Sequence, residues 1–171
     1  MITQTELAYL AGVIDSDGFI TIRRHSPNAL YPSSITFSES MGVLQTSPVV
    51  VQMFQADWGG TIQLRNRKPS KPGGLGWKTQ YAWYVTGRIA VSCIRDIRPY
   101  LRLKTIQADC LLALRESKER PHVEIRQAPG RTSRSRSLNE SVVAFRNDLW
   151  QRCRSLNSRR ASSAMMFRLA R

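Results

Sequence analysis

The sequence predicts an α+β fold in which helices alternate with pairs of antiparallel strands. Apolar residues recur at helical spacing in some segments and alternate with polar residues in others. Capping residues, glycines and prolines separate these segments. Up to residue 117 their order is α-β-β-α-β-β-α-α, and a further helix is predicted at about 139–157. With 171 residues, of which 42% are hydrophobic, we expect residues 1–171 to form a single domain with a substantial core.

The N-terminal part of the chain is predicted to form a short helix followed by two strands. Residues 5–14 place apolar side chains at helical spacing after Thr3 or Thr5, either of which is a suitable N-cap. We expect this helix to end at an acidic, glycine-containing turn, DSDG. Segments 19–25 and 35–45 alternate apolar and polar residues, as half-buried strands do, and a loop rich in Ser, Pro and Asn joins them.

A second helix followed by two strands comes next. Ser47 as N-cap and Pro48 at the first helical position predict the start of a helix, and Gly59 and Gly60 predict its end. The other predicted elements are strands at 61–67 and 78–86 and helices at 88–97 and 104–117. In the first of these strands Ile62 and Leu64 are expected to point inward, because polar and basic residues alternate with them.

The C-terminal part combines a basic segment with a helix. The Arg-, Ser- and Pro-rich stretch at about 118–137 lacks periodicity, so we expect a mobile basic loop able to touch phosphates. The stretch from Ser137 to Glu140 resembles a capping box that opens the helix at about 139–157. One stripe of this helix is predicted to bury Phe145, Leu149, Cys153 and Leu156, and a short tail, 158–171, follows it.

Charge indicates the class of partner. Lys and Arg number 26 against 12 Asp and Glu, which gives a net charge of +14 and a pI near 10.8. Such an excess favours a polyanion, with nucleic acid first and an anionic membrane surface second. No segment has the length of apolar residues that spans a membrane, and the first residues lack the pattern of a secretory signal. We therefore expect a bacterial or phage cytoplasmic protein, or an organellar one if it is encoded there.

Cysteine and histidine give no metal-ligand pattern. Cys93, Cys110 and Cys153 lie far apart in apolar helical segments and form no CxxC or Cys/His spacing. They are expected to be small core residues in a reducing compartment. His25 and His122 have no partner at ligand or nucleophile spacing, so we expect them to face DNA or to lie in a loop.

One motif identifies a family resemblance. Residues 10–18, LAGVIDSDG, match the LAGLIDADG signature at seven of its nine positions, and PYLRLKTIQA at 99–108 resembles a second block of the same family. The chain therefore resembles the LAGLIDADG homing endonucleases. This resemblance implies an α-β-β-α-β-β-α fold with a four-stranded antiparallel, saddle-shaped sheet and C-terminal helices. The chain holds one copy of the motif, which implies the single-motif type that forms a symmetric homodimer.

The motif has a physical interpretation of its own. Ala11 and Gly12 leave a bare helix surface, so two such helices can approach closely and bring two Asp17 carboxylates together. Like charges at that separation are unfavourable unless a divalent cation lies between them, and Mg²⁺ prefers such oxygen ligands. The predicted dimer interface consists of Leu7, Leu10, Ala11, Gly12 and Ile14.

The resemblance assigns roles to individual residues. It implies that Asp17 binds metal, that Ser16 offers its backbone carbonyl to the metal, and that Gln45 orders water. Lys104 matches the basic residue near the scissile phosphate, whereas Val49 stands where one relative's pattern has a further basic residue. Asp15 is expected to be structural and to form hydrogen bonds in its turn. The implied cofactor is Mg²⁺, with Mn²⁺ able to substitute and Ca²⁺ able to bind without supporting cleavage.

The implied activity is metal-dependent cleavage of double-stranded DNA at a long pseudo-palindromic site, leaving 3′ overhangs and promoting intron mobility. Arg, Gln, Thr and Ser on a sheet face suit base readout in the major groove. The DNA-binding candidates are Thr21, Arg23, His25, Ser38, Ser40, Gln63, Arg65 and Arg67. The outward face of the fourth strand stays open, so Gln80, Tyr81 and Trp83 are unassigned. The alternatives are a cleavage-inactive RNA maturase or DNA-binding regulator and, third, a basic RNA-binding structural protein.

Overall fold

A computed structural model describes residues 2–26, 35–65, 78–120, 123–126 and 135–158. The chain divides into two compact units. Unit 1 comprises Met1–Ile20 and Ser40–Ala108, and unit 2 comprises Thr21–Glu39 and Asp109–Arg171. Two strands and one helix run along the chain from one unit into the other.

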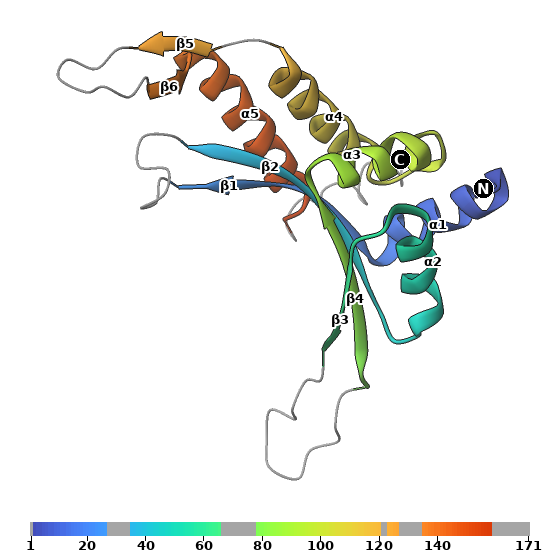
Figure 1. Cartoon of the computed structure of the whole chain (residues 1–171). Coiled ribbons are helices and arrows are strands. Elements are labelled where there is room, and N and C mark those ends of the chain that lie inside the picture. The colour runs from blue at the N-terminus through green and yellow to red at the C-terminus, as the bar shows by residue number, and fades with distance from the viewer. Residues whose placement is uncertain (1, 27–34, 66–77, 121–122, 127–134, 159–171) are drawn as a thin grey trace. The chain divides into compact units, whose positions relative to one another are not determined.

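The elements follow in the order shown in Figure 1. They are α1 (Gln4–Asp17), β1 (Gly18–His25), β2 (Thr36–Gln45), α2 (Pro48–Trp58), β3 (Thr61–Arg65), β4 (Gln80–Thr86), α3 (Gly87–Ile97), the 3-10 helix η1 (Arg98–Tyr100), α4 (Thr105–Glu119), β5 (Val123–Arg126), β6 (Ser135–Leu138) and α5 (Glu140–Leu156). Strands β1 to β4 form one sheet in the order β1-β2-β4-β3. The α+β class and the four-stranded antiparallel sheet predicted from the sequence are confirmed.

Helix α1 is longer than the sequence predicts. Thr3 is its N-cap, and a capping box with Glu6 fixes its start. The helix continues through the predicted turn to Asp17, because the Gly18 N–H still donates to the Ile14 carbonyl. Gly18 is extended and begins β1 directly. A Cβ at this position would lie 2.7 Å from the Ile14 Cα, so only glycine lets the strand leave the helix this closely.

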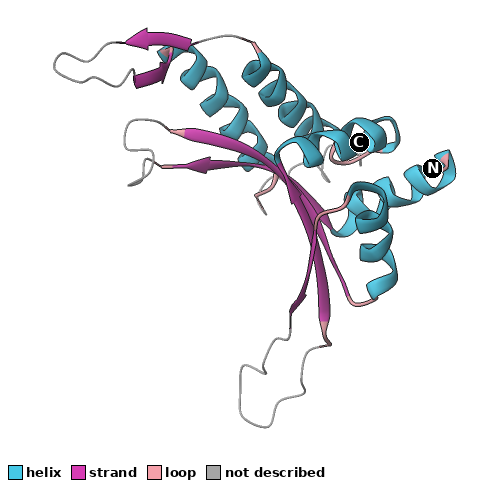
Figure 2. Ribbon diagram, viewed as in Figure 1, coloured by secondary structure: helices cyan, strands magenta, loops and turns pink. Residues whose placement is uncertain are grey.

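The core of unit 1 lies between the sheet and its helices. Helix α2 packs on β3 and β4, and α3 packs on β4 and α1, so the three helices cover one face of these strands (Figure 2). Trp83 of β4 is fully buried and stacks on Phe54 of α2, with 4.6 Å between ring centroids. Its indole N–H donates to the Gly59 carbonyl at 2.8 Å, which ties the end of α2 to the sheet. The predicted Gly59 stop is confirmed, with φ at 69°.

Helix α5 in unit 2 buries Leu149 and Cys153 as predicted, but it does not bury Phe145. Phe145 is 49% exposed, whereas Arg146 is only 6% exposed. The Arg146 guanidinium donates to the Ser117 hydroxyl at 3.0 Å and to its carbonyl at 2.8 Å. These partners on α4 satisfy the cation, so the helix can turn an arginine inward and a phenylalanine outward. The buried residues of α5 are Val142, Arg146, Leu149 and Cys153. The N-cap is Asn139, not Ser137.

The segment predicted as a loop at about 118–137 contains secondary structure. Helix α4 extends to Glu119, and β5 pairs with β6 as an antiparallel hairpin. The reason is visible in VEIR, where apolar and polar residues alternate as in a strand. The rest of that segment, His122 included, and residues 159–171 of the tail lie outside the described residues.

All three cysteines are buried thiols, as predicted. Burial raises the pKa of the Cys153 thiol to about 11, and hydrogen bonds involving the Ile22 backbone and the Thr21 side chain act in the opposite direction. Burial also raises the pKa values of Cys93 and Cys110. In the described part of the chain, every helix falls short of the length and apolar character that crossing a bilayer requires.

Candidate functional site

Two of the predicted catalytic residues meet at the end of α1. Asp17 is the last residue of this helix, and Gln45 is the last residue of β2. The Gln45 Nε2 donates to Asp17 Oδ2 at 2.8 Å. Asp17 is exposed, and no hydrogen bond from the described residues reaches its other oxygen. The fold therefore presents an open carboxylate oxygen whose side chain is oriented by an amide.

Asp15 is structural, as predicted, but its carboxylate binds a distant part of the chain. Oδ2 accepts the backbone N–H groups of Arg102 at 2.6 Å and Leu103 at 3.1 Å, and Oδ1 accepts that of Lys104 at 2.9 Å. The expectation of hydrogen bonds within its own turn is therefore wrong. Both oxygens hold the segment that enters α4.

Lys104 is turned toward the end of α1. Its Nζ donates to the Ile14 carbonyl at 2.7 Å and to the Asp15 carbonyl at 2.5 Å. Burial lowers the pKa of the ammonium, while the negative charges of Asp15 and Asp17 act in the opposite direction. Contact with a scissile phosphate stays a prediction, and the structure adds a second role for this side chain.

The remaining predicted site residues near α1 are exposed. The Ser16 hydroxyl donates to the Val13 carbonyl at 3.2 Å, and a metal contact from the Ser16 backbone stays a prediction. Val49 is 60% exposed at the start of α2, so it presents an apolar side chain where a basic residue was considered. Within the described residues, three or more His, Cys, Asp or Glu side chains nowhere gather as a metal site.

Burial corrects the predicted dimer interface. Leu10, Ala11 and Ile14 are fully buried in the core of their own chain, so a second chain cannot contact them while this fold persists. Gly12 is exposed, and a Cβ added to it would meet nothing within 4 Å. Leu7 is half-buried. The side of α1 open to a partner instead carries Ala8, Tyr9, Gly12, Val13 and Ser16, with Tyr9 51% exposed.

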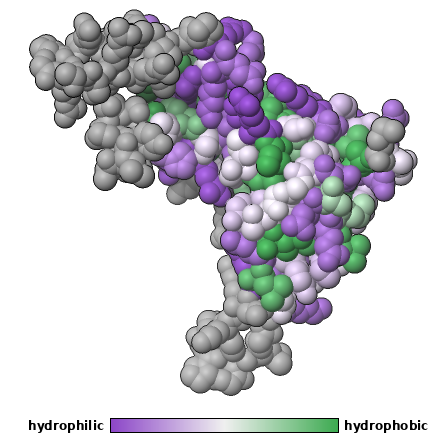
Figure 3. Space-filling model, viewed as in Figure 1, coloured by the Kyte–Doolittle hydropathy of each residue, from purple (hydrophilic) through white to green (hydrophobic). Residues whose placement is uncertain are grey.

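Other apolar side chains also reach the surface of unit 1. Val49 of α2 and Ile89 of α3 are 60% and 45% exposed. In Figure 3, hydrophobic patches interrupt the hydrophilic surface where the helices of this unit lie. In unit 2 the surface over α4 is largely hydrophilic in the same view. The helical side of unit 1 therefore carries exposed apolar surface.

Strand register resolves the face of β4 that the sequence left open. Trp83 packs against α2, so residues that alternate with it point to the opposite face. On that outer face Thr61 pairs with Tyr84, Gln63 with Ala82, and Arg65 with Gln80. The Gln63 Nε2 donates to the Tyr84 hydroxyl at 3.1 Å. Gln80 and Tyr84 therefore join the candidate interface, and only strand pairing could have revealed them.

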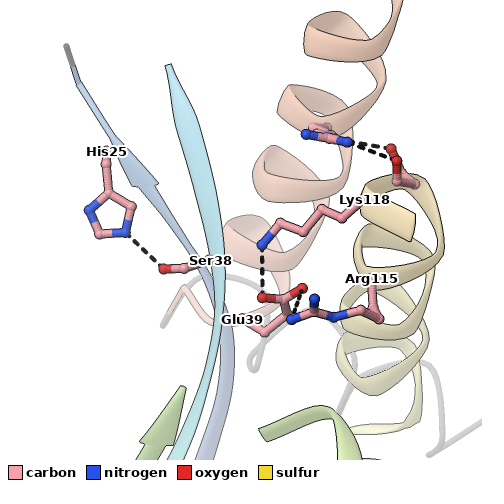
Figure 4. A network of polar contacts seen from close by, with 7 residues as sticks. His25, Ser38, Glu39, Arg115 and Lys118 are labelled. Carbon is pink, nitrogen blue, oxygen red and sulfur yellow. Dashed lines mark hydrogen bonds and ion pairs between the residues drawn. The ribbon is translucent and has the colours of Figure 1, made fainter. Parts of the chain in front are cut away.

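In unit 2, the outer face of β1 and β2 carries Arg23, His25 and Ser38. Arg23 and His25 are exposed, and Ser38 is half-buried. The His25 Nε2 lies 2.8 Å from the Ser38 hydroxyl (Figure 4). Thr21 is half-buried, and its side chain also interacts with Cys153 of α5.

Among the predicted DNA-binding residues, Ser40 does not fit the structure and Arg67 is untested, and the predicted inward orientation of Leu64 is also wrong. Ser40 is fully buried, and its hydroxyl has no hydrogen-bond partner among the described residues, so it is not accessible to DNA in this conformation. Leu64 was expected to point inward but is 61% exposed, because β3 is the edge strand of the sheet and little covers it. Arg67 lies outside the described residues.

A buried charge network begins at Glu39, the residue after Ser38 in β2. Glu39 is fully buried, and its carboxylate receives the Lys118 Nζ at 2.9 Å and the Arg115 guanidinium at 3.2 Å (Figure 4). Burial lowers the pKa of Lys118, and the hydrogen bond and charge of Glu39 partly offset this. The sequence analysis did not single out Glu39, because its partners on α4 are apparent only in the tertiary structure.

Helix α1 presents an exposed aspartate, and the four-stranded sheet has a polar open face. Solved structures share this fold. The structure of the homing endonuclease I-CvuI in complex with its target is 22% identical, with a TM-score of 0.62 over 91% of this chain and 83% of that chain. The archaeal intron-encoded homing endonuclease I-Vdi141I complexed with DNA is 11% identical, with a TM-score of 0.63 over 91% and 86%. No family model matches the sequence, and a search of curated proteins finds no relative. The chain therefore has the LAGLIDADG homing-endonuclease fold.

Proposed function

We propose that this protein is a site-specific double-strand DNA endonuclease that acts as a homodimer on a long pseudo-palindromic site. The observation that carries the proposal is the open Asp17 carboxylate, oriented by Gln45 at the end of a LAGLIDADG-type helix. The similar I-CvuI and I-Vdi141I structures contain DNA, which supports DNA as the partner. A net charge of +14 supports a polyanionic substrate as well.

Sequence recognition is assigned to the outer sheet face. Arg23 and Arg65 offer guanidinium groups suited to guanine, and Gln63 and Gln80 offer amides suited to adenine. His25 and Ser38 form a hydrogen-bonded pair that can present a donor or an acceptor to a base edge. Basic residues would also contact phosphates, so binding should weaken steeply as salt rises.

Divalent-metal use is part of the proposal. Crystals of I-CvuI contained 2 mM Ca in one case and 2 mM Mg with uncleaved DNA in another. The second oxygen of Asp17 is a hard ligand of the kind Mg²⁺ prefers. The described residues of one chain gather no further acidic or histidine ligands into a metal site, so Asp17 fits a site completed by a second Asp17 and by DNA. Bound Mg²⁺ would supply an activated water and stabilise charge on the leaving oxygen. We further propose that Mn²⁺ can replace Mg²⁺ in cleavage and that Ca²⁺ binds without supporting cleavage.

The chain's own residues would bind the metal, order a water molecule and contact a phosphate. Asp17 and the Ser16 carbonyl would bind the ion, and Gln45 would hold the Asp17 carboxylate and order a water molecule. Lys104 keeps one N–H beyond the two that it donates to carbonyls, which could reach a phosphate oxygen. Cleavage of both strands at such paired sites is proposed to leave 3′ overhangs.

The proposed dimer is formed by the exposed side of α1, and Gly12→Leu tests it. The added side chain would point into open space, so the fold should persist, whereas its bulk should keep two helices from close approach. We expect the variant to be monomeric by sedimentation velocity while the wild type is dimeric. Ala144→Leu, at an exposed position of α5, is the matched control and should remain dimeric. A dimeric Gly12→Leu protein would place the interface elsewhere.

The function itself is tested by incubating the dimeric protein with a randomised DNA library and Mg²⁺, then sequencing the cut ends. We expect cuts at one long pseudo-palindromic site with 3′ overhangs. Specific binding without cleavage would instead support a DNA-binding regulator. Selective binding of structured RNA would support a maturase.

A further inference from the structure

The end of α1 and the start of α4 hold each other through two side chains, Asp15 and Lys104, which we term the cross-clamp. The Asp15 carboxylate accepts three consecutive backbone N–H groups, those of residues 102–104. The Lys104 ammonium donates to the carbonyls of Ile14 and Asp15. Five hydrogen bonds therefore join segments about ninety residues apart in the sequence.

Helix-end chemistry explains this arrangement. The Ala108 N–H donates to the Lys104 carbonyl at 3.0 Å, so Lys104 occupies the N-cap position of α4. The lysine side chain has no acceptor. Asp15 instead accepts the N–H of Lys104 itself and those of the two residues before it, and its negative charge lies beside the helix N-terminus, where such a charge is favourable. At the other end, the last turn of α1 contains no basic residue. Lys104 provides the missing positive charge there. Its ammonium donates to the Asp15 carbonyl, which lies among those that a helix end leaves without an intrahelical partner, and it adds a second hydrogen bond to the Ile14 carbonyl, which already accepts the Gly18 N–H.

The cross-clamp is adjacent to Asp17. The carbonyls held by Lys104 belong to residues 14 and 15, within one turn of this aspartate. Terminal helix turns fray when their carbonyls are unsatisfied, and within the described residues the Asp17 side chain has only the Gln45 amide as a partner. The position of its carboxylate therefore depends on the turn that the cross-clamp secures.

We propose that Asp15 is a positioning residue for DNA cleavage, acting through the cross-clamp to hold Asp17 where it binds metal. This inference rests on the proposed function and assigns the two aspartates of the motif different roles. Both Asp15 oxygens are occupied by backbone N–H groups, so Asp15 is not a metal ligand. Asp17, one of whose oxygens accepts no hydrogen bond from the described residues, is the proposed ligand.

Two variants test the proposal, because electrostatics alone would change their affinities for a cation in opposite directions. Asp15→Asn keeps the size of the side chain but replaces one accepting oxygen by an amide that cannot accept N–H groups. Lys104→Met removes the ammonium and keeps the apolar stem. Loss of a nearby negative charge would weaken cation binding, and loss of a positive charge would strengthen it. Loosening of Asp17 would weaken cation binding in both.

The measurement is the Ca²⁺ concentration at half-maximal binding of the cleavage target, which needs no catalysis. We expect both variants to need roughly 10-fold more Ca²⁺, the range found when a ligand loses its supporting hydrogen bonds. Asp15→Asn should also cut the target about 10- to 100-fold more slowly at saturating DNA. Its DNA affinity at saturating Ca²⁺ should stay close to that of the wild type.

Asp96→Asn is the matched control. It removes a carboxylate oxygen that accepts the Trp58 indole N–H at 2.8 Å, in the same unit but not in the cross-clamp. Its Ca²⁺ midpoint should equal that of the wild type. Wild-type midpoints in Asp15→Asn, or a stronger Ca²⁺ response in Lys104→Met, would overturn the proposal. If Asp15→Asn does not fold, Lys104→Met decides by the sign of its shift. Failure of the wild type to cut any target would instead refute the proposed function.

Discussion

Asp17→Asn is expected to abolish DNA cleavage while leaving the fold and specific DNA binding intact. The asparagine oxygen can still accept the hydrogen bond that Gln45 Nε2 donates at 2.8 Å, so the end of α1 should keep its conformation. The negative charge that would bind metal is lost. Metal stabilisation of the transition state contributes several kcal/mol, so the single-turnover cleavage rate should fall by about 1000-fold or more. Gel-based cleavage and binding assays on the same target measure both quantities.

Asp57→Asn provides the matched control for this change. Asp57 is an exposed aspartate on α2 in the same unit, and the substitution removes the same charge. It should leave the cleavage rate close to that of the wild type. Residual cleavage by Asp17→Asn within about tenfold of the wild type would remove Asp17 from the proposed metal site. Loss of binding together with cleavage would indicate that Asp17 acts in the fold.

Glu39→Gln is expected to lower the free energy of unfolding by about 3–5 kcal/mol. Glu39 is fully buried between Lys118 and Arg115, whose side chains are only 22% and 12% exposed. Without the carboxylate these cations stay buried and uncompensated, which is the costly outcome for a broken buried ion pair. Urea denaturation with an unchanged slope measures the difference.

Glu116→Gln is the control, because Glu116 of the same helix pairs with Arg120 just beyond its end, and both side chains are 64% exposed. It should change the unfolding free energy by no more than about 1 kcal/mol. Raising the pH should restore part of the stability lost in Glu39→Gln. Burial already lowers the pKa of Lys118, and the neutral amine costs less to bury than the ammonium. A loss as small as that of the control would mean that Glu39 does not compensate these cations.

Local signals in the sequence were reliable because they describe interactions between near neighbours. Thr3 with Glu6 caps α1, Ser47 opens α2, and Gly59 adopts the positive φ that ends it. Alternation in the strands identified the sheet, because side chains point to opposite faces at every second residue. The same local reasoning failed at Phe145 and Arg146, where hydrophobicity was outweighed by a hydrogen-bonded partner on another helix.

The candidate site was predictable in part. The motif identified Asp17, and the resemblance led to Gln45, which the fold brings to within 2.8 Å of it. Partners across long sequence separations were not predictable, because almost every residue has a backbone N–H group and the sequence does not indicate which of them a side chain binds. The contact of Asp15 with residues 102–104 is of this kind. The face of β4 was also undecided until Trp83 was seen to stack on Phe54.

The sequence by itself determined the order of the helices and strands from α1 to α3, the helix that carries Asp17, and a basic, polar sheet suited to nucleic acid. These features follow from periodicity, capping and charge, which act over a few residues or over the whole chain. Only the tertiary structure decided which side of α1 is open to a partner and how its last turn is secured. Burial of Leu10, Ala11 and Ile14 and the cross-clamp of Asp15 with Lys104 both depend on distant segments packing together.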